Sequence, residues 1–195
     1  MVKELSEMTL EELWQLFPII LKEYNADYVK LYDEERKRLT NAFGRNIILR
    51  ISHIGSTAVP NIISKPIVDI LMEISKNSDK IKVENKLKSM GWLLMNCSET
   101  PYFRQTYNKG YTKYGFDEKV YHLHVRFADD WDELYFRDYL IEHKDIAKEY
   151  EKLKIGLKEK FEYNRDSYTL EKSDFVNKYS AIAKEEYFER YKYEE

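Results

Sequence analysis

The segments His53-Ile-Gly-Ser-Thr-Ala-Val-Pro60 and Lys65-Pro-Ile-Val-Asp-Ile-Leu-Met-Glu73 decide the fold of this chain. They predict the end of one strand, a tight Gly-Ser turn, a short irregular or helical segment and a second strand. Successive side chains of a strand point to opposite faces. One face of the second strand is apolar throughout: Val68, Ile70, Met72 and Ile74. The opposite face is mixed: Ile67, Asp69, Leu71 and Glu73. We therefore expect a sheet with one face on the core and an acid on the face left for a site.

Helices and further strands extend outward from this stretch. A capping box of Thr9 and Glu12 predicts a first helix that ends or bends at Pro18, and a second helix runs to Phe43. The other predicted strands are residues 47–54, 92–97, 102–108 and 121–127, with a charged loop at 109–119. A helix to Met90 separates the second strand from the third, and apolar stripes after Asp130 predict helices for the remainder.

This order predicts an α+β fold with a mixed β-sheet of about five strands, covered by helices, and a C-terminal helical cap. We expect residues 1–195 to form one domain, in which 1–128 hold the N-terminal helices and the sheet. Residues 129–195 then form the C-terminal helical portion.

The composition limits the classes of function. A net charge of −3 and a pI of about 5.9 provide no general basic field for nucleic acid. The N-terminus has no signal-peptide pattern, and no apolar run reaches the roughly 20 residues of a spanning helix. We predict a cytoplasmic protein without membrane contact, whose protein partner, if it has one, the sequence does not identify. Cys97 is the one cysteine and is expected to be a small core residue.

The two opening motifs resemble the GrpB family of the nucleotidyltransferase (polymerase-beta-like) superfamily. Three further segments are similar to GrpB proteins: Thr9–Pro18, His122-Leu-His124 and Phe136–Leu140. The resemblance implies a nucleotidyltransferase-like fold whose pattern is a Gly-Ser turn followed by carboxylates on a strand. It also implies Mg2+ and a nucleotide or another phosphorylated small molecule as ligand. Asn61 stands where the family pattern has glycine.

The turn Gly55-Ser56-Thr57 is a candidate phosphate site, because backbone N–H groups and hydroxyls at the start of a helix bind anions. An ordinary helix-capping turn explains the same residues. Further phosphate contacts are expected from four cations: Lys65, Arg126, Arg137 and Lys172. Lys172 interrupts an apolar stripe and could reach a ligand above the sheet near Arg137 and Lys154, or extend to solvent.

Asp69 fits the first metal carboxylate of the superfamily pattern, but the second position is Leu71. Glu73 lies on the same face about 6.5 to 7 Å further along the strand. His122 and His124 share a face of the last strand with Arg126 and could ligate Mn2+ or Zn2+ instead, or one could act as a general base. The predicted metal ligands are therefore Asp69, Glu73, His122 and His124, and the predicted catalytic residues are Asp69 and His124. A structural acid and structural histidines are the alternative.

Three functions remain open at this point. The first is a metal-dependent nucleotidyltransferase with an unknown acceptor. The second is a nucleotide-sensing or protein-interaction module that lost catalysis when Leu71 replaced the second carboxylate. The third and weakest is a His/Asp metal-dependent phosphoesterase.

Overall fold

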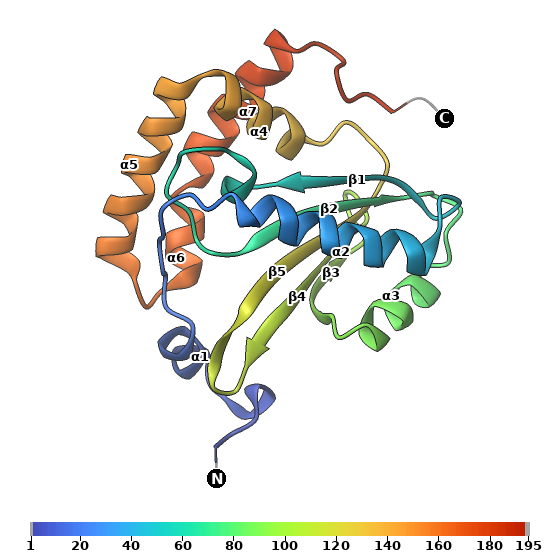
Figure 1. Ribbon diagram of the computed structural model, residues 1–195, viewed down its shortest axis with the longest axis horizontal. Helices are drawn as coiled ribbons and strands as arrows, with labels where there is room; N and C mark the ends of the chain where they lie inside the picture. Colours follow the sequence, from blue (N-terminus) through green and yellow to red (C-terminus); the bar gives the residue numbers. More distant parts are fainter. Residues whose placement is uncertain (1, 194–195) are drawn as a thin grey trace.

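The computed structural model describes residues 2–193 and has the predicted α+β architecture (Figure 1). The strands are β1 (Ile48–Ile54), β2 (Val68–Ile74), β3 (Leu93–Ser98), β4 (Arg104–Thr112) and β5 (Gly115–Phe127). The helices before and within the sheet are α1 (Leu10–Leu16), α2 (Asp27–Phe43) and α3 (Lys80–Ser89), with short 3-10 turns η1 (Leu5–Glu7) and η2 (Ser56–Ala58). The C-terminal helices are α4 (Asp132–Glu142), α5 (Lys144–Phe161), α6 (Arg165–Leu170) and α7 (Ser173–Glu186).

The sheet has the order β1-β2-β5-β4-β3 and is mixed. β2 and β5 run parallel, whereas the other neighbouring pairs are antiparallel. The parallel register places Asp69 beside His122, Leu71 beside His124 and Glu73 beside Arg126. The polar positions that alternate along the two central strands therefore lie in adjacent rows on one face of the sheet.

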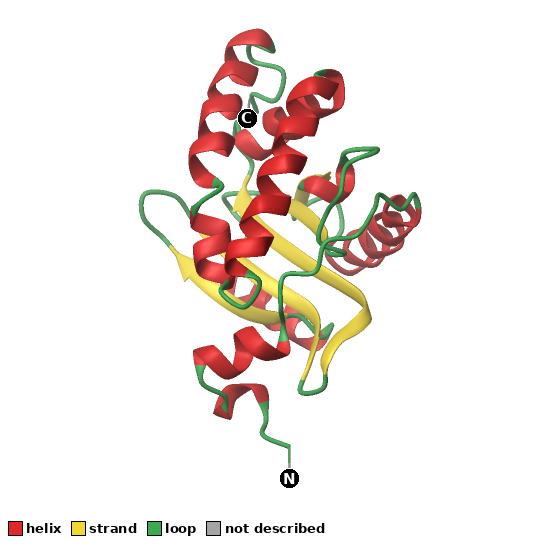
Figure 2. Cartoon of the chain, turned by 90° about the vertical axis from the view of Figure 1, so that its left-hand side faces the viewer, coloured by secondary structure: helices red, strands yellow, loops and turns green. Residues whose placement is uncertain are grey.

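The main core lies on the opposite face. Val68, Ile70, Met72 and Ile74 pack there with Leu39 of α2 and Leu87 of α3. The C-terminal helices lie on the Asp69 face, where Leu71 packs against Trp131 and Leu134, and Figure 2 shows them in front of the strands. Two helical layers thus enclose the sheet, and the polar row lies between the sheet and the C-terminal layer. No helix among residues 2–193 has the length and apolar character needed to cross a bilayer.

The prediction of a loop at 109–119 is wrong. Most of this segment is a β-hairpin, in which β4 extends to Thr112 and β5 begins at Gly115. Charged residues hid this ribbon, whose apolar contacts are few: Tyr111 and Phe116 pack on Phe17 of the N-terminal segment. Gly110 allows the register shift beside it, since its φ is +86° and an added Cβ would lie 2.2 Å from the Lys119 carbonyl oxygen.

Two smaller expectations also need correction. Cys97 is exposed on the edge strand β3 instead of buried in the core. The apolar stripe that Lys172 interrupts, from Tyr168 to Ile182, was expected on one helix. It is divided between α6 and α7, and Lys172 lies in the break between them. This break directs Lys172 toward the sheet, as described below.

Candidate functional site

Asp69 is the centre of the candidate site. Its Oδ1 lies 2.9 Å from Nδ1 of His122 and 3.9 Å from Nε2 of His124, both on the neighbouring strand β5. Burial alone raises the pKa of the Asp69 carboxyl, but the hydrogen bond with His122 and the proximity of both histidines outweigh it and hold the pKa well below its usual range. Burial lowers the pKa of His122, with Asp69 opposing this effect. Asp69 is thus an ionised acceptor beside neutral His122.

A chain of hydrogen bonds orients His122. Arg165 of α6 donates from Nη2 to the Tyr111 hydroxyl at 2.9 Å, and that hydroxyl lies 2.8 Å from Nε2 of His122. With Nδ1–H donating to Asp69, Nε2 of His122 must accept the Tyr111 proton. Both ring nitrogens of His122 are therefore engaged, and the chain connects α6 through the hairpin to Asp69.

The turn at Gly55 fits closely against Asp69. Gly55 has a φ of +70°, and a Cβ built on it would lie 2.4 Å from Oδ2 of Asp69. Only glycine meets both conditions without strain. The Thr57 hydroxyl donates to the Ile67 carbonyl at 3.1 Å and lies 3.0 Å from Nε2 of His53, so it is used to hold the turn. The Ser56 hydroxyl instead lies 3.2 Å from Nζ of Lys154 and faces a cavity.

We name this cavity the basic pocket. It has a volume of about 370 Å3 and lies between the Gly-Ser turn, the sheet and helices α5 and α6. Its charged lining consists of four cations and two acids: Lys65, Lys154, Lys172, Arg165, Asp69 and Asp166. The pocket therefore has an excess of positive charge in a chain whose net charge is −3.

The lysines of the basic pocket disfavour one another's charge. Burial, reinforced by Lys172 and Arg165, lowers the pKa of Lys65 to about 7. Burial and Lys172 lower the pKa of Lys154 to about 7. Burial lowers the pKa of Lys172 to about 8, with Asp69 opposing and Arg165 adding to the effect. An anion in the pocket would relieve this repulsion.

Tyr168 forms part of the wall of the basic pocket. Lys65 and Lys172 lie over its ring, with Nζ 5.6 Å and 4.6 Å from the ring centroid. Its hydroxyl is fully buried and has no hydrogen-bond partner within residues 2–193. Lys65 and Lys172 therefore pack on an aromatic face instead of pairing with an acid.

A second cavity of about 770 Å3 adjoins the basic pocket and shares Gly55, Asp69 and Tyr150 with it. We name it the larger cavity. Its lining includes His124 and an aromatic pair, Tyr102 and Trp131, whose ring centroids are 5.8 Å apart. Ser180 is 3% exposed and contributes a hydroxyl without a partner among the described residues. Asp69 thus stands where the two cavities meet.

The structure does not bring Glu73 to this site. Its carboxylate is fully buried, and Arg50 binds it through Nε at 2.5 Å and Nη2 at 2.7 Å. The backbone N–H of Asp129 donates to the same carboxylate at 3.3 Å. Glu73 therefore closes the far end of the strand as an ion pair and lines neither cavity.

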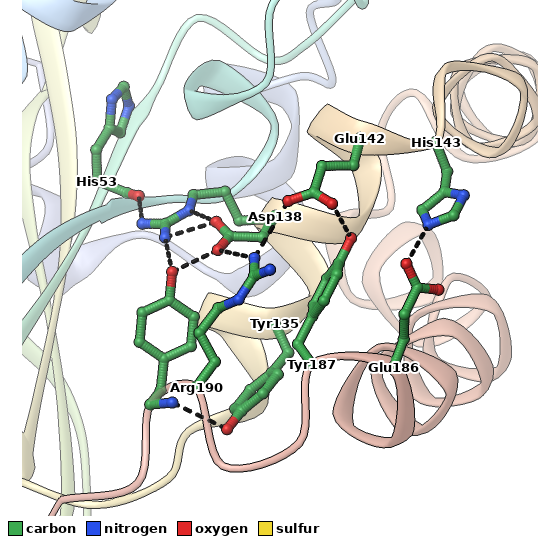
Figure 3. A network of polar contacts seen from close by, with 10 residues as sticks. His53, Tyr135, Asp138, Glu142, His143, Glu186, Tyr187 and Arg190 are labelled. Atoms are coloured by element: carbon green, nitrogen blue, oxygen red, sulfur yellow. Dashed lines mark hydrogen bonds and ion pairs between the residues drawn. The ribbon is translucent and has the colours of Figure 1, made fainter.

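Arg126 and Arg137 also lie outside the basic pocket. Arg126 pairs with Glu133 at 2.6 Å and lies over the ring of Trp131. Arg137 pairs with Asp138 at 2.7 Å and donates to the His53 carbonyl at 3.0 Å. Figure 3 shows this network around Asp138, which connects β1 and α4 to the segment after α7. Of the four predicted cations, Lys65 and Lys172 line the basic pocket.

The donor set does not fit the Mg2+ arrangement that the family resemblance implies. The position of the second carboxylate is Leu71, which is fully buried with Ile54 and Trp131. Both nitrogens of His122 are hydrogen-bonded. Nδ1 carries the proton donated to Asp69, and the lone pair of Nε2 accepts from Tyr111, so it is not open to Mn2+ or Zn2+. Within residues 2–193, no three or more His, Cys, Asp or Glu side chains form a group that could hold a metal ion.

Sequence reasoning missed Arg165, Tyr111 and the Tyr168 hydroxyl as parts of the site. Tyr111 fell within the segment predicted as a loop, and Arg165 within a turn between helices. Lys154 was expected only as a neighbour of Lys172, although it is 2% exposed and also donates to the Ile63 carbonyl. A lysine buried in the middle of an amphipathic helix was the signal available for it.

Comparisons with known proteins match the chain to one family. The family model described as GrpB protein matches residues 18–181. The "Glutamate-rich protein GrpB" of Alkalihalophilus pseudofirmus is 33% identical over 163 residues, which are 82% of this chain and 92% of that protein. The UPF0157 protein YqkA of Bacillus subtilis is 34% identical over 137 residues, 69% of this chain but 38% of YqkA.

A solved structure has the same fold. The crystal structure of the conserved protein GrpB from Enterococcus faecalis superimposes with a TM-score of 0.75 and 28% sequence identity. The match covers 87% of this chain and 99% of that one.

Proposed function

The chain belongs to the GrpB family, and on this premise we propose that it binds a nucleoside triphosphate or another phosphorylated small molecule between its sheet and C-terminal helices. The phosphate lies in the basic pocket, and the larger cavity receives an acceptor. One observation carries this proposal: Lys65, Lys154, Lys172 and Arg165 gather beside the Gly-Ser turn, next to Asp69. Charge-assisted contacts from lysine and arginine are the usual means of holding phosphate.

The reaction that these residues suit is nucleotidyl transfer. An acceptor hydroxyl in the larger cavity attacks the α-phosphorus, the bond to the β-phosphate oxygen breaks, and pyrophosphate leaves. The cations of the basic pocket neutralise the charge that develops on the leaving group. His124 lines the larger cavity with Nε2 3.9 Å from Asp69 Oδ1, a position from which it takes the hydroxyl proton while Asp69 orients it.

A thermal-shift panel tests binding. Nucleoside triphosphates, pyrophosphate and sugar phosphates are added with Mg2+ to the wild type and to a Lys65→Met/Lys172→Met double variant. A ligand at about 100 times its Kd stabilises the native state by about 2.7 kcal/mol, or about 5–10 °C for a chain of this size. We expect this shift in the wild type and its loss in the double variant.

Lys160→Met is the matched control, because Lys160 is an exposed lysine of α5 that lines neither cavity. It should keep the full shift. The absence of a shift with every phosphorylated ligand, or an equal shift in the double variant, would contradict the proposed site.

Leu71 favours a second candidate function, a module that binds the phosphorylated ligand without turnover. Its side chain is fully buried against Trp131 and Leu134, so the position of the second carboxylate has become part of the apolar core. Affinity for a nucleoside triphosphate, with no release of pyrophosphate from it in the presence of any acceptor tested, would favour this module over the transferase.

A further inference from the structure

We propose that the basic pocket holds its phosphate group with side-chain cations alone, so that Lys65, Lys154, Lys172 and Arg165 take the place of a divalent metal. The ligand then binds as a metal-free anion with at least two negative charges. This inference rests on the proposed function, since it concerns the same pocket. It differs from the expectation drawn from the family resemblance, in which Mg2+ accompanies the nucleotide.

The balance of charge in the pocket defines the class of ligand. Four cations and two acids line it, which leaves an excess of two positive charges when all are ionised. A phosphate monoester, a diphosphate or a triphosphate without metal would neutralise this excess.

Two of the cations form no ion pair with an acid among residues 2–193. Among residues 2–193, neither the Lys65 nor the Lys172 side chain forms a hydrogen bond or an ion pair, and each instead lies over the Tyr168 ring. An ammonium group has three donors to satisfy. Tyr168 itself also lines this pocket. Two ammonium groups without an acceptor among the described residues thus line one cavity, as expected of a site that a multivalent anion completes.

The other two cations are already placed by the protein. Lys154 is anchored by the Ser56 hydroxyl at 3.2 Å and by the Ile63 carbonyl, so its charge is fixed beside the Gly-Ser turn. Arg165 is oriented by its hydrogen bond to Tyr111 at 2.9 Å. Preorganised charges of this kind stabilise a phosphate without the reorganisation that free side chains require.

The acids on the same side of the sheet are arranged against a bridging metal. Asp69 accepts from His122, Glu73 is bound by Arg50, and Leu71 occupies the position between them. In a metal-bridged complex Asp69 would be an essential ligand. In the arrangement that we propose, Asp69 is a negative charge next to a bound anion and opposes its binding. The two cases therefore predict opposite effects of removing this charge.

The experiment measures the affinity of ATP and of inorganic tripolyphosphate by calorimetry, once with Mg2+ and once with excess EDTA. We expect binding in EDTA to be at least as tight as in Mg2+. Lys172→Met and Lys65→Met should each weaken it by about tenfold to a hundredfold, as expected for loss of a charge-assisted contact. Lys160→Met is the control, and the Tm of each variant without ligand verifies that it folds.

Asp69→Asn gives the second arm. We expect it to tighten the binding of tripolyphosphate in EDTA, because a like charge is removed and the amide can still accept from His122. Loss of binding in Asp69→Asn, or binding that requires Mg2+, overturns the inference while leaving the proposed function in place. Failure of both ligands to bind under either condition overturns the proposed function itself. Comparison of ATP with tripolyphosphate distinguishes a nucleotide from any phosphoanion as the ligand.

Discussion

Two acids on one face of β2 have opposite environments. Glu73 is fully buried and paired with Arg50, whose guanidinium also donates to the carbonyl oxygens of Asp129 at 2.7 Å and Tyr191 at 2.9 Å. Asp69, four residues earlier, has 26% of its side chain exposed and lies where two cavities meet. Two acids on the same face of one strand therefore have different roles: Glu73 stabilises the fold, and Asp69 lines the candidate site.

The neighbours of each acid explain this difference. The partner of Glu73 is a guanidinium that fits a carboxylate with two parallel contacts, and the full burial of Glu73 keeps a ligand away from it. The partners of Asp69 are histidines and a glycine turn, which leave open space on its other side. A carboxylate on a strand face indicates a site only where its surroundings leave it accessible.

The largest effect is expected at the closed end of the strand. Arg50→Ala leaves the buried Glu73 carboxylate without its partner and should lower the free energy of unfolding by about 3–5 kcal/mol. Urea denaturation measures this loss. Arg36→Ala, which breaks an exposed pair with Asp33, is the control and should cost less than about 1 kcal/mol. Equal losses of stability in the two variants would show that the buried Glu73 carboxylate does not need Arg50 as its partner.

At the open end, Gly55→Ala should cost about 1–3 kcal/mol, since the new Cβ meets Oδ2 of Asp69 and the φ is positive. Because the clash displaces Asp69, affinity for a phosphorylated ligand should change as well. Gly156→Ala in α5 is the matched control: nothing lies within 4 Å of its added Cβ, and the helix should gain about 0.5–1 kcal/mol. If Gly55→Ala keeps both its stability and its affinity for the ligand, the Gly-Ser turn is not part of the binding site.

Ligand affinity should fall with increasing pH. The pKa of Lys65 and that of Lys154 are about 7 and that of Lys172 about 8, so these groups lose charge above neutrality in the empty pocket. The phosphate stays charged in this range, since its second pKa is about 6. Binding of the anion must then return protons to these lysines. Affinity should therefore fall by about tenfold or more from about pH 7.5 to 9.5.

The stability of the empty protein should change in the opposite direction. A lysine with a depressed pKa in the folded state binds fewer protons than in the unfolded state, so stability rises with pH from about 7 to about 10. The Lys65→Met/Lys172→Met double variant should show a smaller change in both quantities. A wild-type affinity that does not depend on pH in this window would mean that the lysines do not contact the ligand.

The sequence predicted the fold because its pattern is local. Alternation along Val68–Ile74 and Tyr121–Phe127 placed Asp69, His122 and His124 on the site face, and the family motifs agreed with this. The hairpin was missed because charged residues on an exposed ribbon carry no apolar alternation. Its stability comes from contacts with Phe17, distant in sequence.

The charged residues of the site were harder to predict, because partners distant in the sequence decide their roles. Asp138 and Lys172 both interrupt apolar helical stripes, yet Asp138 pairs with Arg137 whereas Lys172 lines the basic pocket. The break between α6 and α7, which the sequence did not reveal, makes this difference. The direction of a long side chain depends on such breaks more than on its position in a stripe.

The smallest effect is expected for the stability of Asp69→Asn. The amide oxygen still accepts from His122, but the ionised carboxylate that the two histidines stabilise is lost, so the free energy of unfolding should fall by about 1–2 kcal/mol. Glu73→Gln at the closed end should cost about 3 kcal/mol, because Arg50 then lacks an anionic partner. Urea denaturation of both variants measures the contrast directly. If the two amides cost the same, Asp69 is as structural as Glu73, and the lysines of the basic pocket become the only evidence for a site on this face.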